Sequence, residues 1–435
     1  MKIRDFLEID YLLLLPVIVL LIIGILFIYS SGITSTGVLV SNEYLRQIVW
    51  ASCGLVLALT LAMINYSRFY NISIYMYLII LLPLLYTLIF GRVLYGARWL
   101  RIGSFGIQAS EFAKIAVIIF LARYLSDTKR NENSFVRFFV SCAIVFVPMG
   151  IVLIQPDLGT ALVFIPILLT MTFIAGVAMH YVIFLGSCIL LTGLFMVLPL
   201  WQAYILGKTI QVLVILTNPK FIAVASSFLS IIAGIALFGY IKYKKRYFYW
   251  IVYAVAIIVF SLSASFMAGK VLKNYQIMRL IVFIDPNVDP RGAGWNIIQS
   301  ITAIGAGGLT GNGYLQGTQS HYRYLPEQST DFIFSIFSEE TGFIGGLIVF
   351  ILYLIIILRL LRIMKMTNDT FACYICAGLA GMYGFHFLIN VGMTMGIMPI
   401  TGIPLLFLSY GGSAVFSAMT GIGLALSIHV RRHNR

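Results

Sequence analysis

The sequence is poor in charged residues, and acids are the scarcest of them. Only 10% of the 435 residues are charged, with 29 Lys and Arg against 15 Asp and Glu, whereas soluble domains carry roughly a quarter charged residues. This deficit excludes the two or three soluble domains that the length would otherwise allow. Hydrophobic residues make up 61% of the chain and its mean hydropathy is +1.00, so a lipid bilayer is the solvent that suits it.

Cysteine is also scarce. The five cysteines lie in or near apolar segments, which favours a role in helix packing. Cys373 and Cys376 have a CxxC spacing, but they begin an apolar helix with no histidine nearby, so we interpret them as packing residues rather than as a metal or redox site. The sequence shows no internal repeat, no low-complexity tail and no cleavable signal, because its first apolar run lacks a small-residue cleavage site.

Long apolar runs dominate what is present. A run of about 20 apolar residues spans the hydrocarbon core as a helix. We therefore predict an all-α polytopic membrane bundle, in which residues 1–435 form one transmembrane domain with about twelve spans. The apolar stretch 205–216 is short and is expected to lie at the membrane interface. The predicted spans are 11–30, 46–65, 72–90, 111–126, 137–154, 159–177, 180–200, 221–241, 247–267, 341–362, 372–396 and 403–429.

The formal charge of +14 reflects membrane orientation rather than nucleic-acid binding. Most Lys and Arg residues lie in short polar gaps between apolar runs, for example in 242–246 and 431–435. In membrane proteins, the short loops that carry the excess of Lys and Arg face the cytoplasm. This placement predicts that both termini are cytoplasmic and that residues 268–340 lie outside.

Residues 268–340 form the one long polar stretch, and they hold six of the fifteen acids. Their glycines, prolines and aromatic residues indicate an ordered loop with short helices, and loops of this length are usually functional or disordered. Two Asp-Pro pairs begin at Asp285 and Asp289. Proline makes the residue before it extended or turned, so each carboxylate is held on a stiff segment. The alternative is that both acids only cap turns.

A second group of charges falls inside apolar sequence. Glu111 and Lys114 in QASEFAK are three residues apart and share one helix face, and Asp157 lies in QPDLGT. A charge at mid-bilayer costs about 2.5–3.5 kcal/mol on insertion scales, so we expect Lys114 to pair with Glu111 or Asp157. The group forms either a polar cavity or an ion pair that fixes helix register.

Two further features stand out. Arg92, Arg98 and Arg101 lie on the predicted external side, where arginines can bind a pyrophosphate or a lipid headgroup. Near the C-terminus, MGIMPITGIPLLFLSYGGSA interrupts apolar sequence with proline and glycine, and such a break is tolerated only where it is buried in protein or lines a cavity. We interpret His386 as a packed polar group rather than as a metal ligand.

These motifs together resemble the RodA/FtsW family, the SEDS peptidoglycan glycosyltransferases. The resemblance follows the chain in order and covers most of it, and the GTQS tetrapeptide looks more like the elongation member, RodA. The motifs are ARWLRIGSFGIQASEFAK, QPDLGT, DPNVDPRGAGWNIIQS, GTQS, YLPEQSTDFIF, SEETGFIGG and TGIPLLFLSYGGS.

The resemblance implies a protein of the bacterial inner membrane that polymerises lipid II into glycan strands for cell elongation and rod shape, and releases undecaprenyl pyrophosphate. It implies membrane lipids and a class B penicillin-binding protein, a transpeptidase, as partners. It makes Asp289 the essential loop acid, acting as general base or as ligand of a divalent cation such as Mg or Mn, although no acid cluster demands a cofactor. The remaining candidates for substrate binding or the cavity are Glu111, Lys114, Asp157, Arg98, Arg101, Lys273, Arg279, Gln299 and Ser300.

The chain departs from the family pattern most in residues 201–268. Family members commonly have ten spans, and the apolar runs 221–241 and 247–267 predict an inserted helix pair. Two added spans leave residues 268–340 on the same side of the membrane. The competing functions are a lipid II flippase, which the buried charges and broken helix would also suit, and a structural scaffold for the elongation machinery.

Overall fold

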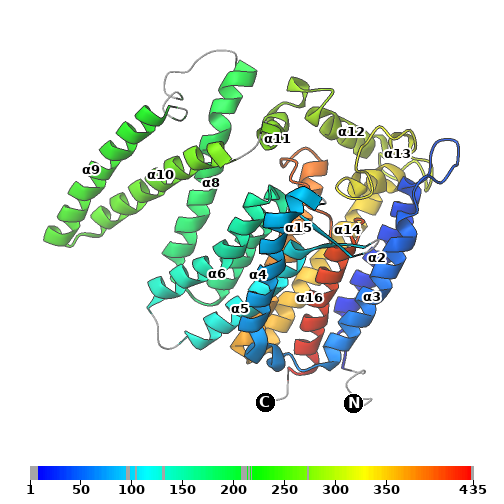
Figure 1. The fold of residues 1–435 in the computed structure, drawn as a ribbon, viewed down its shortest axis with the longest axis horizontal. Helices are drawn as coiled ribbons and strands as arrows, with labels where there is room; N and C mark the ends of the chain where they lie inside the picture. Colours follow the sequence, from blue (N-terminus) through cyan, green and yellow to red (C-terminus); the bar gives the residue numbers. More distant parts are fainter. Residues whose placement is uncertain are drawn as a thin grey trace. The chain divides into compact units, whose positions relative to one another are not determined.

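The computed structural model describes residues 8–94, 98–102, 105–129, 133–206, 213, 216, 218–271 and 274–432, and nearly all regular structure in them is helical (Figure 1). The long helices are α2 (Tyr11–Ser31), α3 (Glu43–Met63), α4 (Ser67–Leu94), α5 (Ala109–Asp127), α6 (Ser134–Ile154), α7 (Leu158–Ile174), α8 (Met179–Trp201), α9 (Pro219–Tyr243), α10 (Arg246–Val271), α14 (Ile333–Met366), α15 (Thr370–Thr394) and α16 (Gly412–Val430). The shorter ones are a π-helix (Gln202–Leu206), α11 (Asn274–Ile284), a 3-10 turn (Pro286–Val288), α12 (Ala293–Ala306) and α13 (Thr318–His321).

Each predicted span corresponds to one long helix, so the predicted multi-pass bundle is confirmed. Within the described residues, ten helices are long and apolar enough to cross a membrane. The other two predicted spans are α5 and α7. Helix α5 carries Glu111 and Lys114 and is packed among α4, α6, α7, α15 and α16, so it is shielded by protein. Helix α7 has only 17 residues.

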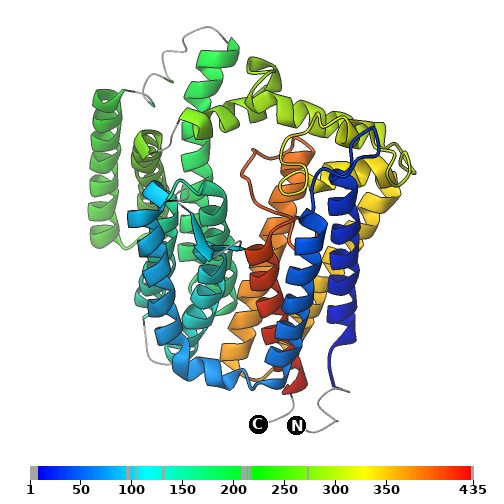
Figure 2. The same ribbon diagram turned by 45° about the vertical axis from the view of Figure 1, so that its right-hand side comes forward.

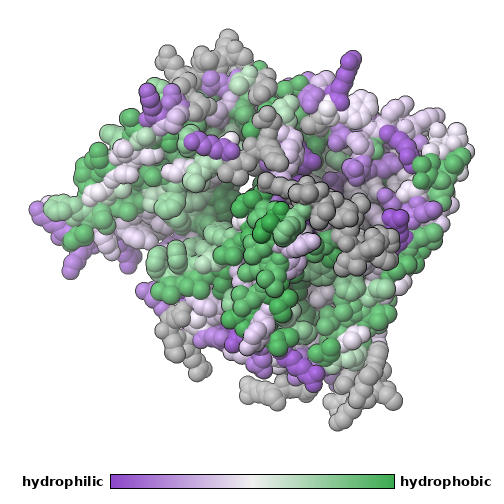
Figure 3. Space-filling view, in the orientation of Figure 1, coloured by the Kyte–Doolittle hydropathy of each residue, from purple (hydrophilic) through white to green (hydrophobic). Residues whose placement is uncertain are grey.

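The chain divides into two compact units, one made of Met1–Val177 with Asn296–Arg435 and the other of Ala178–Trp295. In the first unit α2 packs on α14, α3 on α16, and α15 on α5, α7 and α14 (Figure 2). In the second unit α10 packs on α8 and α9, and α11 contacts α8. On the face shown in Figure 3, apolar side chains gather over the middle of the helices and polar ones toward their ends, as a membrane protein requires.

Aspartates begin several of these helices. Asp10 accepts a hydrogen bond from the backbone N–H of Leu13 at 3.2 Å, and Asp369 accepts one from Phe371 at 3.0 Å. A side-chain oxygen at this position satisfies a backbone N–H that has no partner inside the helix. In lipid, where an unsatisfied backbone group costs several kcal/mol, such caps fix where a span starts.

Helix α14 begins at Ile333, earlier than the predicted 341, and it is broken at Gly342 (φ 67°). The break leaves backbone groups that the helix no longer pairs, and the preceding loop takes them. The N–H of Phe343 donates to Gly308 O at 2.9 Å, and the N–H groups of Asn312 and Gly313 donate to Glu339 O and Glu340 O at 3.0 Å each. The loop is therefore hydrogen-bonded to the helix at its kink.

The predicted span 403–429 begins later than expected, because α16 starts only at Gly412. Residues 395–411 form an irregular, largely buried segment whose carbonyl groups accept hydrogen bonds from neighbouring helices. Asn390 Nδ2 donates to Ile403 O at 2.8 Å, and Gln47 Nε2 donates to Ser409 O at 3.1 Å. These partners replace the helix, and the predicted buried break is confirmed.

One local feature was not predicted from the sequence. Residues 99–108 include an antiparallel hairpin of β1 (Trp99–Ile102) and β2 (Phe105–Gln108), with Trp99 opposite Gln108. It docks on the start of α16, where the N–H of Gln108 donates to Ser413 Oγ at 3.0 Å. The predicted interfacial stretch 205–216 falls largely outside the described residues. The predicted short helices of loop 268–340 are present as α11, α12 and α13.

Candidate functional site

Asp289 lies in the second unit, in a tight turn between the 3-10 turn and α12. Its backbone carbonyl accepts hydrogen bonds from the N–H groups of Gly292 at 3.3 Å and Gly294 at 3.0 Å. Its half-buried carboxylate folds over Gly292, where an added Cβ would come within 3.0 Å of both carboxylate oxygens. The glycines of DPRGAG are therefore needed so that the turn can close around this acid.

The other acid of the pair, Asp285, has a local role. It precedes the 3-10 turn, and its Oδ1 accepts the backbone N–H of Asn287 at 2.9 Å and the Asn287 side-chain amide at 3.0 Å. The capping alternative therefore holds for Asp285. Arg279 of α11 lies in the same unit, with its guanidinium 5.7 Å from the ring centre of Tyr275, one helical turn earlier. Lys273 lies outside the described residues.

Gln299 and Ser300 belong to the part of α12 in the first unit. Ser300 is fully buried, its Oγ lies 2.6 Å from Ser335 Oγ, and it donates to Thr394 O at 2.7 Å. This hydroxyl therefore ties α12 to α14 and α15. Gln299 is half-buried on the same helix.

Glu111 and Lys114 form the predicted buried ion pair. Their Oε2 and Nζ atoms are 2.9 Å apart, and the two side chains are 4% and 1% exposed. Lys114 Nζ is also 3.1 Å from Nε2 of His386. His386 Nδ1 lies 3.1 Å from Pro404 O, a carbonyl that can only accept, so Nδ1 carries the proton and Nε2 accepts from the ammonium. The pair therefore connects α5 to α15 and to the irregular segment 395–411.

Asp157 is held apart from this pair. It caps α7 through the N–H and hydroxyl of Thr160 at 3.3 and 3.0 Å, and Gln108 Nε2 donates to it at 2.7 Å. Arg98 lies 3.8 Å from its carboxylate with a 38% exposed side chain, and it also donates to Pro156 O. Two predicted site residues, Arg98 and Asp157, thus meet beneath the hairpin. The backbone of Arg101 lies in β1.

Gly159 brings this capped helix start against the irregular segment. A Cβ at Gly159 would come within 3.0 Å of Thr401 O, so the QPDLGT turn and the TGIP turn are in backbone contact. The structure therefore joins three sequence motifs in the first unit: Gly159 of QPDLGT contacts the segment 395–411, and Lys114 of QASEFAK reaches it through His386. Asp289 is described within the second unit.

The sequence interpretation missed two buried acids, Glu339 and Glu340 in α14. Glu339 accepts from the N–H of Gln319 at 2.8 Å and the hydroxyl of Thr318 at 3.1 Å. Glu340 accepts from the N–H of Leu315 at 3.0 Å and from the hydroxyl of Ser30. Both acids lie in the quoted motif SEETGFIGG. The apolar sequence around them signals that they are buried and need partners, but not which loop supplies those partners.

The chemical capacity of the site follows from these environments. In the part of the chain that the structure describes, no group of three or more His, Cys, Asp or Glu side chains could hold a metal ion. Glu111, Asp157, Glu339 and Glu340 each have cationic or N–H and O–H partners. Asp289 lies in a glycine turn of a polar loop, which suits it to meet a substrate.

Comparisons with known proteins agree with the motif pattern. The family model for the FtsW, RodA and SpoVE cell cycle proteins matches residues 11–239 and 204–434. The peptidoglycan glycosyltransferase RodA of Treponema pallidum (strain Nichols) is 50% identical over 434 residues, covering 99% of this chain and 100% of that protein. The peptidoglycan glycosyltransferase MrdB of Escherichia coli (strain K12) is 31% identical, covering 98% and 95%.

Solved structures share the fold. A chain of a peptidoglycan synthase complex, described for its coordination of polymerization and crosslinking, superimposes with a TM-score of 0.66 at 24% identity, covering 98% of this chain and 99% of that one. The rod shape determining protein RodA of Thermus thermophilus gives a TM-score of 0.59 at 21% identity, with 98% of both chains covered. This chain is a multi-pass membrane protein that belongs to the FtsW/RodA/SpoVE family.

Proposed function

We propose that this chain is a peptidoglycan glycosyltransferase that polymerises lipid II during cell elongation. The observation that carries the proposal is the placement of Asp289 in a glycine turn, within a chain that is half identical to a peptidoglycan glycosyltransferase RodA over nearly its whole length. The membrane bundle suits a substrate that is anchored in lipid.

In the proposed reaction, Asp289 accepts the proton of the acceptor sugar's 4-hydroxyl as that oxygen bonds to the donor's anomeric carbon. The bond from the anomeric carbon to the pyrophosphate oxygen breaks, and undecaprenyl pyrophosphate leaves with the bonding electrons. Cations must stabilise that leaving group. Among the predicted cations Arg98, Arg101, Arg279 and Lys273, Arg279 is the one described in the same unit as Asp289.

A divalent cation fits this site only with help from the substrate. Magnesium is commonly bound by one or two carboxylates together with substrate phosphates. Asp289 would supply the carboxylate and the substrate the pyrophosphate oxygens, and the bound cation would neutralise charge on the leaving group.

We further propose that the protein lies in the bacterial inner membrane with both termini cytoplasmic and the loop 268–340 outside. The basic residues of the gap 242–246 support this orientation. Asp10, just before α2, and His429, in the last turn of α16, lie 3.6 Å apart, so the start of the first span and the end of the last are on the same side of the membrane. The partner is a class B penicillin-binding protein, which cross-links the strands that this chain makes. The structural likeness to a chain of a peptidoglycan synthase complex supports such a partner.

The test uses the purified chain with its penicillin-binding partner and lipid II, with glycan strands resolved on a gel. Asp289→Asn is expected to lower the polymerisation rate about a hundredfold or more, the range for loss of a general base. Asp285→Asn is the matched control, because Asp285 is already bonded to Asn287, and it should keep most of the rate. Polymerisation at the wild-type rate by Asp289→Asn would refute the assignment.

A further inference from the structure

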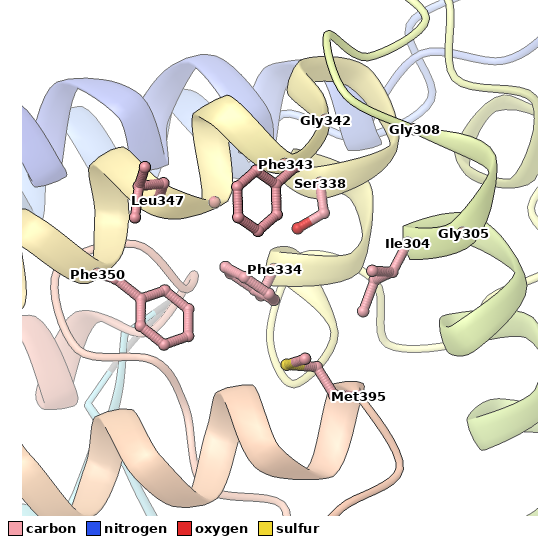
Figure 4. Close-up of a pocket in the computed structure, with 11 residues that line it drawn as sticks. Ile304, Gly305, Gly308, Phe334, Ser338, Gly342, Phe343, Leu347, Phe350 and Met395 are labelled. Carbon is pink, nitrogen blue, oxygen red and sulfur yellow. The ribbon is translucent and has the colours of Figure 1, made fainter.

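The first unit contains a cavity that no step above uses. It has a volume of about 390 Å³, within the range of small-molecule sites, roughly 300–1,000 Å³. It lies between the end of α12, both halves of α14 and the end of α15 (Figure 4). Its walls are apolar, with Ile304, Phe334, Phe343, Phe350 and Met395 turned toward it.

Glycines line this space, and at two of them a missing side chain leaves it unfilled. Gly305, Gly308, Gly342 and Gly346 all line it. A Cβ added at Gly305 would meet nothing within 4 Å, and one at Gly346 would meet only the tip of the Phe334 ring at 3.7 Å. Side chains would therefore fit at both helical positions. Because glycines leave this apolar space unfilled where side chains would fit, an apolar ligand from outside can occupy it.

One polar group inside the cavity lacks a partner. Ser338 is 4% exposed, and its hydroxyl finds no hydrogen-bond partner among the described residues. Figure 4 shows its oxygen turned toward the space between Phe334 and Phe343. A buried hydroxyl without a partner is unfavourable. The occupant is therefore a hydrocarbon that carries one hydrogen-bonding oxygen.

The cavity opens on the apolar surface of a candidate membrane span. Phe343, Leu347 and Phe350 line it and are 65%, 48% and 40% exposed, and all three lie on α14, which is long and apolar enough to cross a membrane. A ligand that enters here comes from the bilayer, so its hydrocarbon is the chain of a lipid.

We propose that this cavity binds the first isoprene units of a polyprenyl chain, with the ester oxygen that joins the chain to its phosphate against the Ser338 hydroxyl. This inference rests on the proposed function for the identity of the lipid. Two observations favour the polyprenyl lipid over a bulk phospholipid. Gly308 and Phe343 line the cavity, and the Phe343 N–H donates to Gly308 O at the base of the loop. The wall residues Ile304 and Gly305 belong to α12, the helix that follows the Asp289 turn.

The experiment is photolabelling of the full-length chain in phospholipid nanodiscs. The probe is undecaprenyl phosphate with a diazirine on the isoprene next to the phosphate, and a phosphatidylglycerol with a diazirine on its acyl chain is run in parallel. We expect the polyprenyl probe to label peptides of α12 and α14, and unlabelled undecaprenyl phosphate to compete. Equal labelling of these peptides by the phospholipid probe, without such competition, would overturn the proposal in favour of bulk lipid.

Filling the cavity tests its position. Gly346→Leu and Gly305→Leu are each expected to lower polyprenyl labelling at least fivefold. Gly150→Leu in α6 is the matched control, since a Cβ there also meets nothing within 4 Å but lies outside the cavity, and its labelling should stay unchanged. Unchanged labelling in both filled variants, with melting temperatures like that of the control, would refute the site.

The contact of the Ser338 hydroxyl is tested separately, through competition for labelling. Ser338→Ala should weaken competition by undecaprenyl phosphate about threefold to tenfold, and leave competition by the uncharged hydrocarbon squalene unchanged. Equal effects on both competitors would contradict the proposed contact. Labelling needs no turnover, so Asp289→Asn should label normally. A wild-type chain that labels at this cavity but makes no glycan would refute the proposed function and leave this site standing.

Discussion

At the scale of single residues, the buried charges show how the chain keeps ions inside a membrane bundle. Lys114 is 1% exposed, yet its ammonium is neutralised by Glu111 and donates to His386. Asp10 is likewise buried and pairs with Arg359 at 2.6 Å. An isolated buried charge would be far more costly than such a pair, so each of these ions depends on its partner.

The first prediction concerns this dependence. Lys114→Met leaves the Glu111 carboxylate buried without its cation, and should lower the free energy of unfolding by about 3–5 kcal/mol. The double variant Glu111→Gln with Lys114→Met removes both charges and should recover most of that loss. The measurement is the unfolding of the purified protein in detergent. A double variant as unstable as the single one would show that charge pairing is not what Lys114 contributes.

The sequence predicted that Lys114 pairs with Glu111 or Asp157, but it did not predict the surroundings of the pair. Glu111 and Lys114 are three residues apart on one helix, and that spacing alone brings them together. His386 was predicted only as a packed polar group, because its contact with Lys114 depends on how α15 lies against α5. Glu339 and Glu340 were missed for the same reason. Their partners are N–H and hydroxyl groups of the loop and of α2, and no local pattern in the sequence indicates such contacts.

At the scale of elements, broken helices organise the first unit. Helix α14 is interrupted at Gly342, and α16 begins only after the irregular segment 395–411. The prolines and glycines of that segment predicted a break, but its length could not be predicted. Side chains such as Asn390 and Gln47 supply partners to its backbone, and these side chains come from helices that lie far away in the sequence.

The second prediction tests the contact between two of these elements. In Gly159→Ala, the new Cβ would come within 3.0 Å of Thr401 O, so α7 or the irregular segment must shift, which should lower the free energy of unfolding by about 1–3 kcal/mol. Gly150→Ala is the control, because its Cβ meets nothing within 4 Å. It should be neutral or gain up to about 1 kcal/mol from helix propensity. Equal melting temperatures for the two variants would contradict the contact.

The third prediction concerns the loop that Glu339 holds. In Glu339→Ala, the N–H of Gln319 and the hydroxyl of Thr318 lose their acceptor, so the loop should open more often. Trypsin cleavage after the exposed Arg323 should then become about tenfold faster, because cleavage follows the population of the open form.

Glu327→Ala is the control for this cleavage, because Glu327 is exposed in the same loop, and its rate should stay near that of the unchanged chain. Cleavage that is equally slow in Glu339→Ala would mean that the carboxylate does not anchor the loop.

At the scale of the whole molecule, the number of spans decides which side of the membrane the loop faces. The twelve predicted spans all exist as helices, although α5 and α7 do not meet the length and hydropathy of the other ten. Helix α5 is covered by protein, so it needs less apolar surface than a span that faces lipid. Helix α7 is apolar but has only 17 residues. That residues 201–268 are an insertion stays a prediction.

The fourth prediction tests this insertion through topology. Helix α9 packs on α10, α10 packs on α8, and α11 also contacts α8. The test variant replaces residues 203–272 by a flexible linker between α8 and α11, which removes two spans. Because two crossings are lost, the loop should stay on its original side.

The measurement is cysteine labelling from outside the membrane. A cysteine is placed at the exposed Asn312, in a chain whose five native cysteines are replaced by alanine. In the linker variant it should still react with a membrane-impermeant maleimide in spheroplasts. Removal of α10 alone changes the number of crossings by one, and should abolish that labelling. Equal labelling of the two deletions would show that the helices after α10 insert independently of it, and would contradict the proposed pairing of α9 and α10 as two membrane crossings.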